Sequence, residues 1–355
     1  MRRRGLLLAL LGGAARADGI ARGRVLRFPR DHGAHLEART EWWYATGWSG
    51  TEAEPRHGVQ LTFFRSRTGL AEGVDSRFAA RQLLFAHAAV TDLAAQRHRH
   101  AQRIVRWSGD GPTALAAAST TDAELRVERW TLRRDAQGWH ATLPADAFTI
   151  ALQLQPTQPL LLQGDAGFSR KGPDERQASE YYSEPQLAAS GTLTLDGRPV
   201  AVAGRAWLDH EWSDELLHPQ AVGWDWIGID LFDGSSLTAF QLRRADGSAL
   251  WAGGSFRARG QTSTSFAPDA VRFTPGRHWT SPASRARYPV QWQIETPAGA
   301  FELRALMDAQ ELDSRASTGA IYWEGLSELL DAQGRRVGLG YLEMTGYAGA
   351  LRLRW

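Results

Sequence analysis

The chain has 355 residues, of which 41 are basic and 39 acidic, and its formal net charge is +2. It contains no cysteine, which excludes disulfides, a thiolate nucleophile, a cysteine-ligated zinc site and a lipoprotein anchor. The length favours two domains with a large buried core. No run of Lys and Arg residues lies on a predicted helix, so we expect no nucleic-acid partner.

The first residues have the pattern of a secretory signal. Arginines at positions 2–4 precede an apolar run over 6–15, and Ala15-Arg16-Ala17 forms an A-x-A cleavage site. The run is shorter than the roughly 20 residues that span a bilayer. We therefore expect residues 1–17 to be a signal peptide, of Sec or twin-arginine type, and the protein to be periplasmic or secreted. A disordered basic N-terminus is the alternative. Without the four arginines of this segment the net charge becomes 2 − 4 = −2.

Strand patterns dominate the rest of the chain. Apolar and polar residues alternate in GVQLTFFR (58–65), AFTIALQLQ (147–155) and VQWQIE (290–295), which is the period of half-buried strands. Turn sequences such as LDGRP (195–199) and RADGS (244–248) lie between such segments. Helical windows are few and short. Many short strands joined by hairpin turns predict an all-β sandwich or barrel.

The two halves of the chain show a weak internal echo. EWWYATG (41–47) is followed by LTFFR, and WDWIGID (224–230) is followed by LTAFQLR, with Trp43 and Trp226 half a chain apart. A duplicated barrel would produce this echo, and so would chance similarity between tryptophan-rich strands. We expect domains over 18–192 and 193–355, with the boundary in SGTLTLDGRP (190–199).

Aromatic and ionisable residues gather in four segments: HLEARTEWWYATG (35–47), FAHAAVTD (85–92), GRAWLDHEWSDE (204–215) with GWDWIGIDLFDG (223–234), and YWEGL (322–326) with GYLEMTGY (340–347). Successive side chains of a strand point to opposite faces. His210 then shares a face with Leu208 and Trp212, whereas Asp209 and Glu211 share the other face with Trp207. By the same rule, Asp225, His210 and His87 each point where apolar residues point, and Tyr322 shares a face with Glu324.

A carboxyl group in an apolar site either is paired or keeps its proton. A raised pKa makes such a group a usable general acid, and aromatic faces around it tolerate positive charge. These segments could therefore protonate an alkene, or bind an apolar ligand by one polar end. The structural alternative is an ion pair with one of the many arginines. We expect burial to raise the pKa of Asp225 unless an Arg or His pairs with it.

Other chemistries have little support in the sequence. His32 with His35, and His98 with His100, lack a second ligand pair at zinc-like spacing, and a strand would splay residues 209–211 to opposite faces. No G-x-S-x-G elbow and no glycine-rich phosphate loop occurs. We therefore expect neither a metal nor a cofactor.

The four segments, together with LTFFR and YYSEPQL (181–187), resemble the AttH-like family, which includes carotenoid 1,2-hydratase (CrtC) and predicted secreted hydrolases. The resemblance extends from about residue 35 to 347. It implies two lipocalin-like β-barrel domains packed side by side, with a cleft between them, and cofactor-independent hydration of an isolated isoprenoid double bond. EWWYATG and LTFFR resemble the secreted branch more than the pigment enzymes, so the substrate stays open.

The resemblance supplies His210, Trp212 and Asp225 as site candidates, followed by Tyr44, Glu41 and Glu324. We expect Asp225, His210 and Glu324 to be catalytic. The ligand-binding candidates are Trp212, Trp226, Tyr44, Trp43, Glu41, His87, Asp209 and Tyr322. We expect His210, Trp212, Asp225, Tyr44 and Glu324 to meet in one concavity.

Two classes of function follow from these residues and from the resemblance. One is a hydratase-type lyase that acts on an apolar alkene by protonation and water capture. The other is a periplasmic protein that binds a lipid or another apolar ligand for an ABC transporter permease. An enzyme needs a proton donor in the pocket, whereas a carrier needs only an apolar cavity. We expect a monomer in either case.

Overall fold

A computed structural model describes residues 20–70, 72–74, 76, 79–109, 111 and 114–351. The predicted signal peptide over 1–17 lies outside the described residues. Within them the protein is all-β, with only two short 3-10 helices, η1 (Arg30–His32) and η2 (Pro268–Ala270). None of the helices in this part of the chain could cross a membrane. The predicted fold class is confirmed, and the strands expected at 58–65, 147–155 and 290–295 are present.

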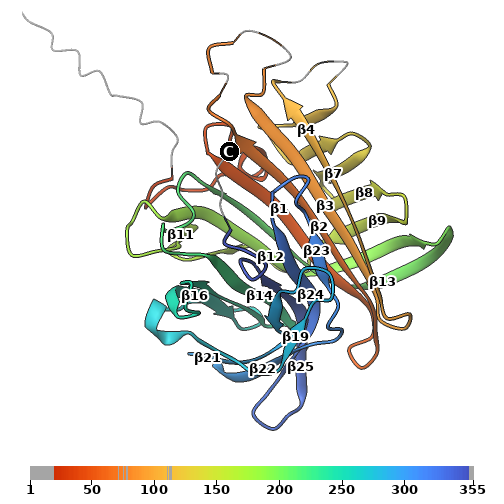
Figure 1. The fold of residues 1–355 in the computed structure, drawn as a ribbon, viewed down its shortest axis with the longest axis vertical. Helices are drawn as coiled ribbons and strands as arrows, with labels where there is room; N and C mark the ends of the chain where they lie inside the picture. Colours follow the sequence, from red (N-terminus) through yellow and green to blue (C-terminus); the bar gives the residue numbers. More distant parts are fainter. Residues whose placement is uncertain are drawn as a thin grey trace, which may run out of the picture.

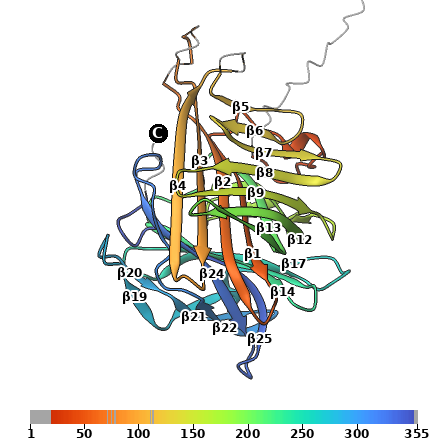
Figure 2. The ribbon, with the colours of Figure 1, turned by 90° about the vertical axis from the view of Figure 1, so that its right-hand side faces the viewer.

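The first sheet holds the N-terminal half of the chain (Figures 1 and 2). Its strand order is β4-β3-β2-β1-β13-β12-β9-β8-β7-β6-β5, and β10 and β11 also pair with β12. The edge strands β4 and β5 approach each other, so the sheet curls into a nearly closed barrel. The strands are β1 (Thr40–Gly50), β2 (Pro55–Arg67), β3 (Gln82–Asp92), β4 (Arg97–Trp107), β5 (Ala116–Ala118), β6 (Glu124–Val127), β7 (Trp130–Asp135), β8 (Gly138–Pro144), β9 (Phe148–Gln155), β10 (Leu161–Leu162), β11 (Phe168–Arg170), β12 (Ala178–Leu195) and β13 (Arg198–Ser213).

The second sheet holds the C-terminal half and lies below the first in both views (Figures 1 and 2). Its order is β17-β16-β15-β14-β25-β24-β22-β21-β18, β23 pairs with β24, and β19 and β20 form a separate hairpin. The strands are β14 (Gly223–Leu231), β15 (Ser236–Arg243), β16 (Ala249–Arg257), β17 (Thr264–Ser265), β18 (Arg272–Pro275), β19 (His278–Thr280), β20 (Arg287–Pro289), β21 (Gln291–Thr296), β22 (Gly299–Ala305), β23 (Glu311–Asp313), β24 (Ile321–Leu330) and β25 (Arg336–Met344).

The change from one sheet to the other comes later than the boundary expected at 192/193. The predicted turn LDGRP joins β12 to β13, with Leu195 paired to Arg198, and both strands belong to the first sheet. Asp196 and Gly197 have positive φ angles of 49° and 77°, the backbone that a tight hairpin turn requires. The DG turn signal therefore marks a hairpin within the first barrel, and the second sheet begins with β14 after Ser213.

Each barrel encloses its own apolar core, and a third apolar cluster lies between the two sheets. The interior of the first barrel includes Trp43, Trp139 and Leu208, and that of the second includes Ile227 and Ile229. The interface cluster is instead rich in rings, with Tyr44, Trp48, Trp207, Trp226, Phe240 and Tyr341. A Cβ on Gly58 would lie 2.6 Å from the Tyr341 hydroxyl oxygen, so glycine permits the sheets to approach closely there.

Candidate active site

A cleft opens between the two sheets, with about 1210 Å³ of empty space including its mouth. The first sheet contributes the outward faces of β1, β2, β3, β12 and β13, and the second contributes those of β14, β15, β24 and β25. The apolar part of its lining is mostly aromatic, with Trp42, Phe64, Phe85, Trp224, Trp226, Phe240, Leu216, Leu217 and Leu242. Such a cleft, large and apolar with a few polar groups, is the usual form of a small-molecule site.

Strand alternation decides which side chains reach the cleft. In β13 the residues Trp207, Asp209 and Glu211 face outward, and Tyr44 on β1 is paired directly with Asp209. In β14 the outward residues are Trp224 and Trp226. The two strands are thus buried on both faces, one against a barrel core and one against the neighbouring barrel.

Asp209 is a buried carboxyl group with neutral partners. The Ser183 hydroxyl donates to its Oδ1 at 2.5 Å and the Trp207 indole donates to the same atom at 2.7 Å. Burial raises the pKa of Asp209 to about 7, although these hydrogen bonds and one from Tyr181 act to lower it. Asp209 therefore changes its protonation state near neutral pH.

Two glutamates on neighbouring strands form the acidic part of the second wall. Glu324 on β24 is paired directly with Glu343 on β25, and both line the cleft. Residues in this register have Cβ atoms roughly 5 Å apart. Burial, with the nearby Glu343, raises the pKa of Glu324 well above its usual value. Burial also raises the pKa of Glu343 to about 7, against a 3.0 Å hydrogen bond from the Trp224 indole.

Tyr44 connects the two walls. Its hydroxyl lies beside Glu324, yet neither that hydroxyl nor Glu324 Oε1 has an aligned hydrogen-bond partner among the described residues. Its ring meets that of Trp226 edge-on at 5.4 Å. Burial, followed by the nearby glutamates, raises the pKa of the Tyr44 hydroxyl well above its usual value. A buried hydroxyl and a carboxyl oxygen that lack an aligned hydrogen bond and face a cleft can bond to a molecule held there.

The remaining charged groups of the cleft are paired. Glu211 forms a 2.9 Å ion pair with Lys171, the only lysine in the chain. His87 bridges the two halves of the molecule through Tyr322 and Ser317, each at 2.8 Å. Burial lowers the pKa of His87 to about 3, so it is neutral at physiological pH.

Four of the predicted site residues point away from the cleft. The carboxylate of Asp225 faces the interior of the second barrel, where it lies 2.8 Å from Arg243 Nε and accepts hydrogen bonds from Gln241 and Tyr347. Burial still raises the pKa of Asp225, although Arg243 opposes that rise. His210, Trp212 and Trp43 lie inside the first barrel. The expected convergence of five side chains is therefore wrong for Asp225, His210 and Trp212, and it holds for Tyr44 and Glu324.

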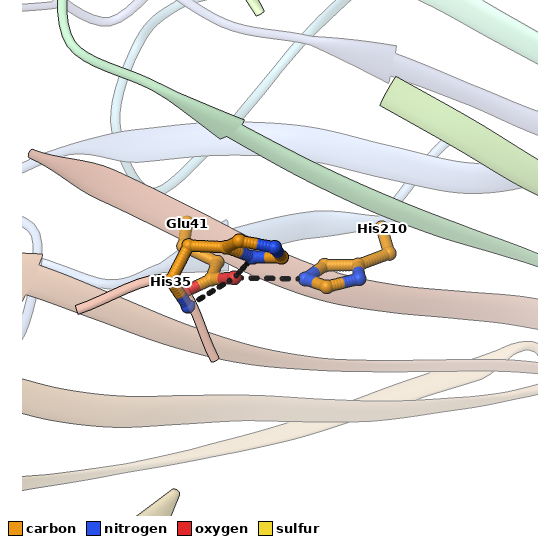
Figure 3. A group of neighbouring side chains, drawn as sticks. All are labelled: His35, Glu41 and His210. Carbon is orange, nitrogen blue, oxygen red and sulfur yellow. Dashed lines mark hydrogen bonds and ion pairs between the residues drawn. The ribbon is translucent and has the colours of Figure 1, made fainter. Parts of the chain in front are cut away.

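The barrel-side residues form a second polar cluster with Glu41 at its centre (Figure 3). Glu41 Oε1 lies 2.7 Å from His35 Nδ1 and 3.0 Å from His210 Nε2, and Oε2 accepts a 2.7 Å hydrogen bond from Arg65 Nε. Burial would raise the pKa of Glu41, but Arg65 and His35 lower it well below its usual value. The His35 ring stacks on that of Trp212 at 3.7 Å. Glu41 also borders the cleft, although its carboxylate is bonded on the barrel side.

The ligand atoms of His35, Glu41 and His210 lie within 4.8 Å of one another, which is compact enough for a metal ion. Glu41 Oε1 already lies within hydrogen-bond distance of both rings. The guanidinium of Arg65 occupies the other oxygen and would repel a second cation. These residues therefore fit a hydrogen-bonded ion-pair cluster better than a metal centre.

The sequence analysis brought Tyr44, His87, Asp209, Trp226, Tyr322 and Glu324 into the cleft, as the structure does. It did not select Glu211, Glu343, Lys171, Trp42 or Trp224. Glu211 and Glu343 lie inside the motifs DHEW and GYLEMTGY, and each shares the cleft with a tryptophan that is its cross-strand neighbour or hydrogen-bond donor. The sequence did place Glu211 on the same strand face as Trp207 and Asp209, which was a usable signal, whereas the pairing of Glu343 with Trp224 joins different strands and could not be seen in the sequence.

Comparison with known proteins agrees with the fold and with the sequence resemblance. Residues 20–347 match the model of the AttH-like family. A crystal structure from Nitrosomonas europaea that bears the AttH name is 44% identical, with a TM-score of 0.85 over 93% of this chain and 100% of that chain. Kievitone hydratase from Nectria haematococca is 15% identical, with a TM-score of 0.69 over 92% and 94% of the two chains.

The crystal structure of CghA shares the fold at 13% identity, with a TM-score of 0.55 over 87% and 88% of the two chains. A search of curated proteins finds no match. The family model covers nearly all of the described residues, and the Nitrosomonas structure is similar over its whole length. The chain belongs to the AttH-like family.

Proposed function

We propose that this protein is a cofactor-independent hydratase-type lyase, which adds water to, or removes it from, an apolar molecule held in the interdomain cleft. The observation that carries the proposal is a set of three carboxyl groups, the buried Asp209 and Glu324 and the half-buried Glu343, which face one aromatic cleft without a cation beside them in the described part of the chain. A carboxyl group that keeps its proton near neutral pH is suited to general acid catalysis. The hydratase name of a protein with the same fold is consistent with this chemistry.

Two of these groups, Glu324 and Asp209, have a role in such a reaction. Glu324 keeps its proton and donates it to one alkene carbon, while the double-bond electrons form the new C–H bond. The adjacent carbon becomes positive and is stabilised by the ring faces of Trp224 and Trp226. Water attacks that carbon and loses its proton to the carboxylate of Asp209, so that one water is added in all. Dehydration follows the same steps in reverse.

The reaction needs an acid and a base in a mainly apolar cleft, all of which the chain itself supplies. The substrate would be isoprenoid or lipid-like, because the lining is mainly apolar. We also propose that the protein works outside the cytoplasm. The second candidate is a non-catalytic carrier of an apolar ligand for an ABC transporter, which the apolar lining alone would favour.

The test compares two buried acids of the second sheet that face opposite ways. Glu324→Gln removes the acid of the cleft, and Asp225→Asn removes the acid paired with Arg243. Water addition to an isoprenoid alkene such as geraniol would be measured by mass spectrometry with H₂¹⁸O, beside analysis of ligands that co-purify with the protein. We expect Glu324→Gln to lower the rate on the order of 100-fold or more without loss of ligand binding.

Asp225→Asn is expected to lower the melting temperature, while the folded fraction stays active. An unchanged rate in Glu324→Gln would contradict the assigned role of this acid. Binding of apolar ligands without turnover in the wild type would favour the carrier.

A further inference from the structure

We infer that the cleft selects its ligands by charge: it takes apolar molecules that are neutral or carry a protonated amine, and it rejects those that end in a carboxylate or phosphate. The inference rests on the proposed function only in taking the cleft as the ligand site. It separates neutral isoprenoids from fatty acids and phospholipids, which an apolar lining alone would accept equally well.

The basic side chains that line the cleft already form ion pairs and hydrogen bonds with other groups of the protein. Lys171 Nζ pairs with Glu211 at 2.9 Å, lies 3.1 Å from the Ser169 hydroxyl, and sits over the rings of Tyr181 and Phe240 at 4.7 and 4.5 Å. These four neighbours leave the ammonium group few donors for a bound anion.

Arg65 is committed in the same way. It donates to Glu41 at 2.7 Å, to the carbonyls of His35 and Ala38 at 2.7 and 2.8 Å, and to the side chain of Gln82 at 2.7 Å. The guanidinium is fully buried on the barrel side of the wall. Among the described residues that line the cleft, no basic side chain is therefore left to bind an anionic end group.

The acids have no such compensation. Asp209 accepts hydrogen bonds from neutral groups, Glu343 accepts one from the Trp224 indole, and Glu324 Oε1 has no aligned partner in the described part of the chain. The other titratable groups facing them are Tyr44, Tyr181 and Tyr322, all protonated, the neutral imidazole of His87, and Glu211 with its ion-pair partner Lys171. An anionic ligand would add a further negative charge to this set, whereas a cation would offset one.

The aromatic lining acts in the same direction. Indole faces attract cations and do not attract anions, and Trp224 and Trp226 stand next to the acids, with Trp226 paired directly with Glu343. An apolar amine also carries the charge that develops on carbon when an alkene is protonated. The cleft should therefore bind a cation more tightly than the neutral molecule of the same shape.

The experiment uses three probes with one carbon skeleton: geranylamine, geraniol and geranic acid. Binding to the whole protein is followed by tryptophan fluorescence and checked by calorimetry at pH 6 and pH 8. At pH 8 we expect geranylamine to bind about tenfold more tightly than geraniol, and geranic acid at least about tenfold more weakly, as one partly screened charge pair would produce.

The pKa values of the cleft acids predict how the affinity for each probe changes with pH. Asp209 and Glu343 both have pKa values of about 7, so they lose protons between pH 6 and pH 8. The amine should then bind more tightly at pH 8 than at pH 6, the carboxylate more weakly, and the alcohol nearly equally.

Three variants make the test specific. Glu343→Gln should reduce the preference for the amine several-fold. Glu295→Gln, the same change on an exposed residue of the same sheet, should leave it unchanged. Glu211→Gln should act in the opposite direction and improve binding of geranic acid, because it releases Lys171 from its ion pair.

Geranic acid that binds as tightly as geraniol to the wild type would overturn the inference, and so would a preference that Glu343→Gln leaves intact. If none of the probes binds, both proposals fail together. The expected order of binding without any turnover would support charge selection and contradict the hydratase. Turnover of geraniol without a difference in affinity among the three probes would support the hydratase and contradict charge selection.

Discussion

The strand pair β1 and β13 carries a buried polar cluster on each of its faces, and the two clusters are opposite in character. On the barrel side, Trp43 is paired with His210. Glu41, two residues before Trp43 on the same face of β1, forms an ion pair with Arg65. On the cleft side, Tyr44, the residue after Trp43, is paired with Asp209, the residue before His210. The backbone and the degree of burial are the same, so the difference lies in which partners the side chains meet.

The pKa values follow the partners. Arg65 and His35 lower the pKa of Glu41 despite its burial, whereas burial raises the pKa of Asp209 to about 7. A buried ion pair ties the first barrel together. An unpaired buried carboxyl group costs stability and is retained where its proton has a use. The comparison therefore favours a structural role for the barrel cluster, and it supports the proposed role of the cleft cluster in the reaction.

The largest expected effect tests the barrel cluster. Arg65→Met leaves Glu41 buried without its cation and leaves the carbonyls of His35 and Ala38 without their donor. We expect the free energy of unfolding to fall by about 3–5 kcal/mol, because breaking a buried pair strands its partner. Urea denaturation measures this. The double variant Arg65→Met with Glu41→Gln should recover part of the loss, and a loss below about 1 kcal/mol would contradict a structural role.

The second effect concerns stability against pH and tests the cleft cluster. Asp209 has a pKa of about 7 in the folded protein and 3.8 as its reference value. Between these values the unfolded chain has lost the proton that the folded protein keeps, so stability falls as pH rises. From pH 5 to pH 8 the contribution of Asp209 to this fall is about 3 kcal/mol, at about 1.4 kcal/mol per pKa unit.

Asp209→Asn removes this term while keeping the shape of the side chain. The free energy of unfolding of the variant should therefore decline less between pH 5 and pH 8 than that of the wild type. Urea denaturation across that range gives the two slopes. Parallel pH profiles would mean that Asp209 is ionised throughout and has a partner that compensates its charge.

Much of the architecture could be predicted from the sequence, because it depends on local patterns. The alternation in GVQLTFFR and AFTIALQLQ identified strands, and the motifs identified the family and its two barrels. The domain boundary was misplaced because the DG turn at Asp196 and Gly197 closes a hairpin, and a local turn signal does not tell which sheet its strands join.

The site was harder to predict from the sequence. Alternation shows which side chains share a face of a strand, but it does not show which face lines the barrel interior and which lines the cleft. In β14 both faces are apolar, and the sequence analysis chose the face of Asp225, Ile227 and Ile229. The structure shows that aliphatic residues fill the barrel and that Trp224 and Trp226 face the cleft. The Arg243 partner of Asp225 comes from the neighbouring strand, so its pairing could not be seen in the sequence.

The smallest effect on stability is expected at Tyr44 in the cleft cluster. Tyr44→Phe removes a buried hydroxyl that has no aligned hydrogen bond among the described residues, and it keeps the ring against Trp226. Nothing is stranded, so the free energy of unfolding should change by less than about 1 kcal/mol. The hydroxyl lies beside Glu324 and acts to lower its pKa. Its loss should therefore raise the pKa of Glu324 further and make it a poorer proton donor, with hydration about tenfold slower, within the range of general acid effects. Rate and denaturation measured on the same preparation separate these outcomes. A stable variant with the full rate would remove Tyr44 from the site, and a large loss of stability would place its hydroxyl in a paired network like that of Glu41.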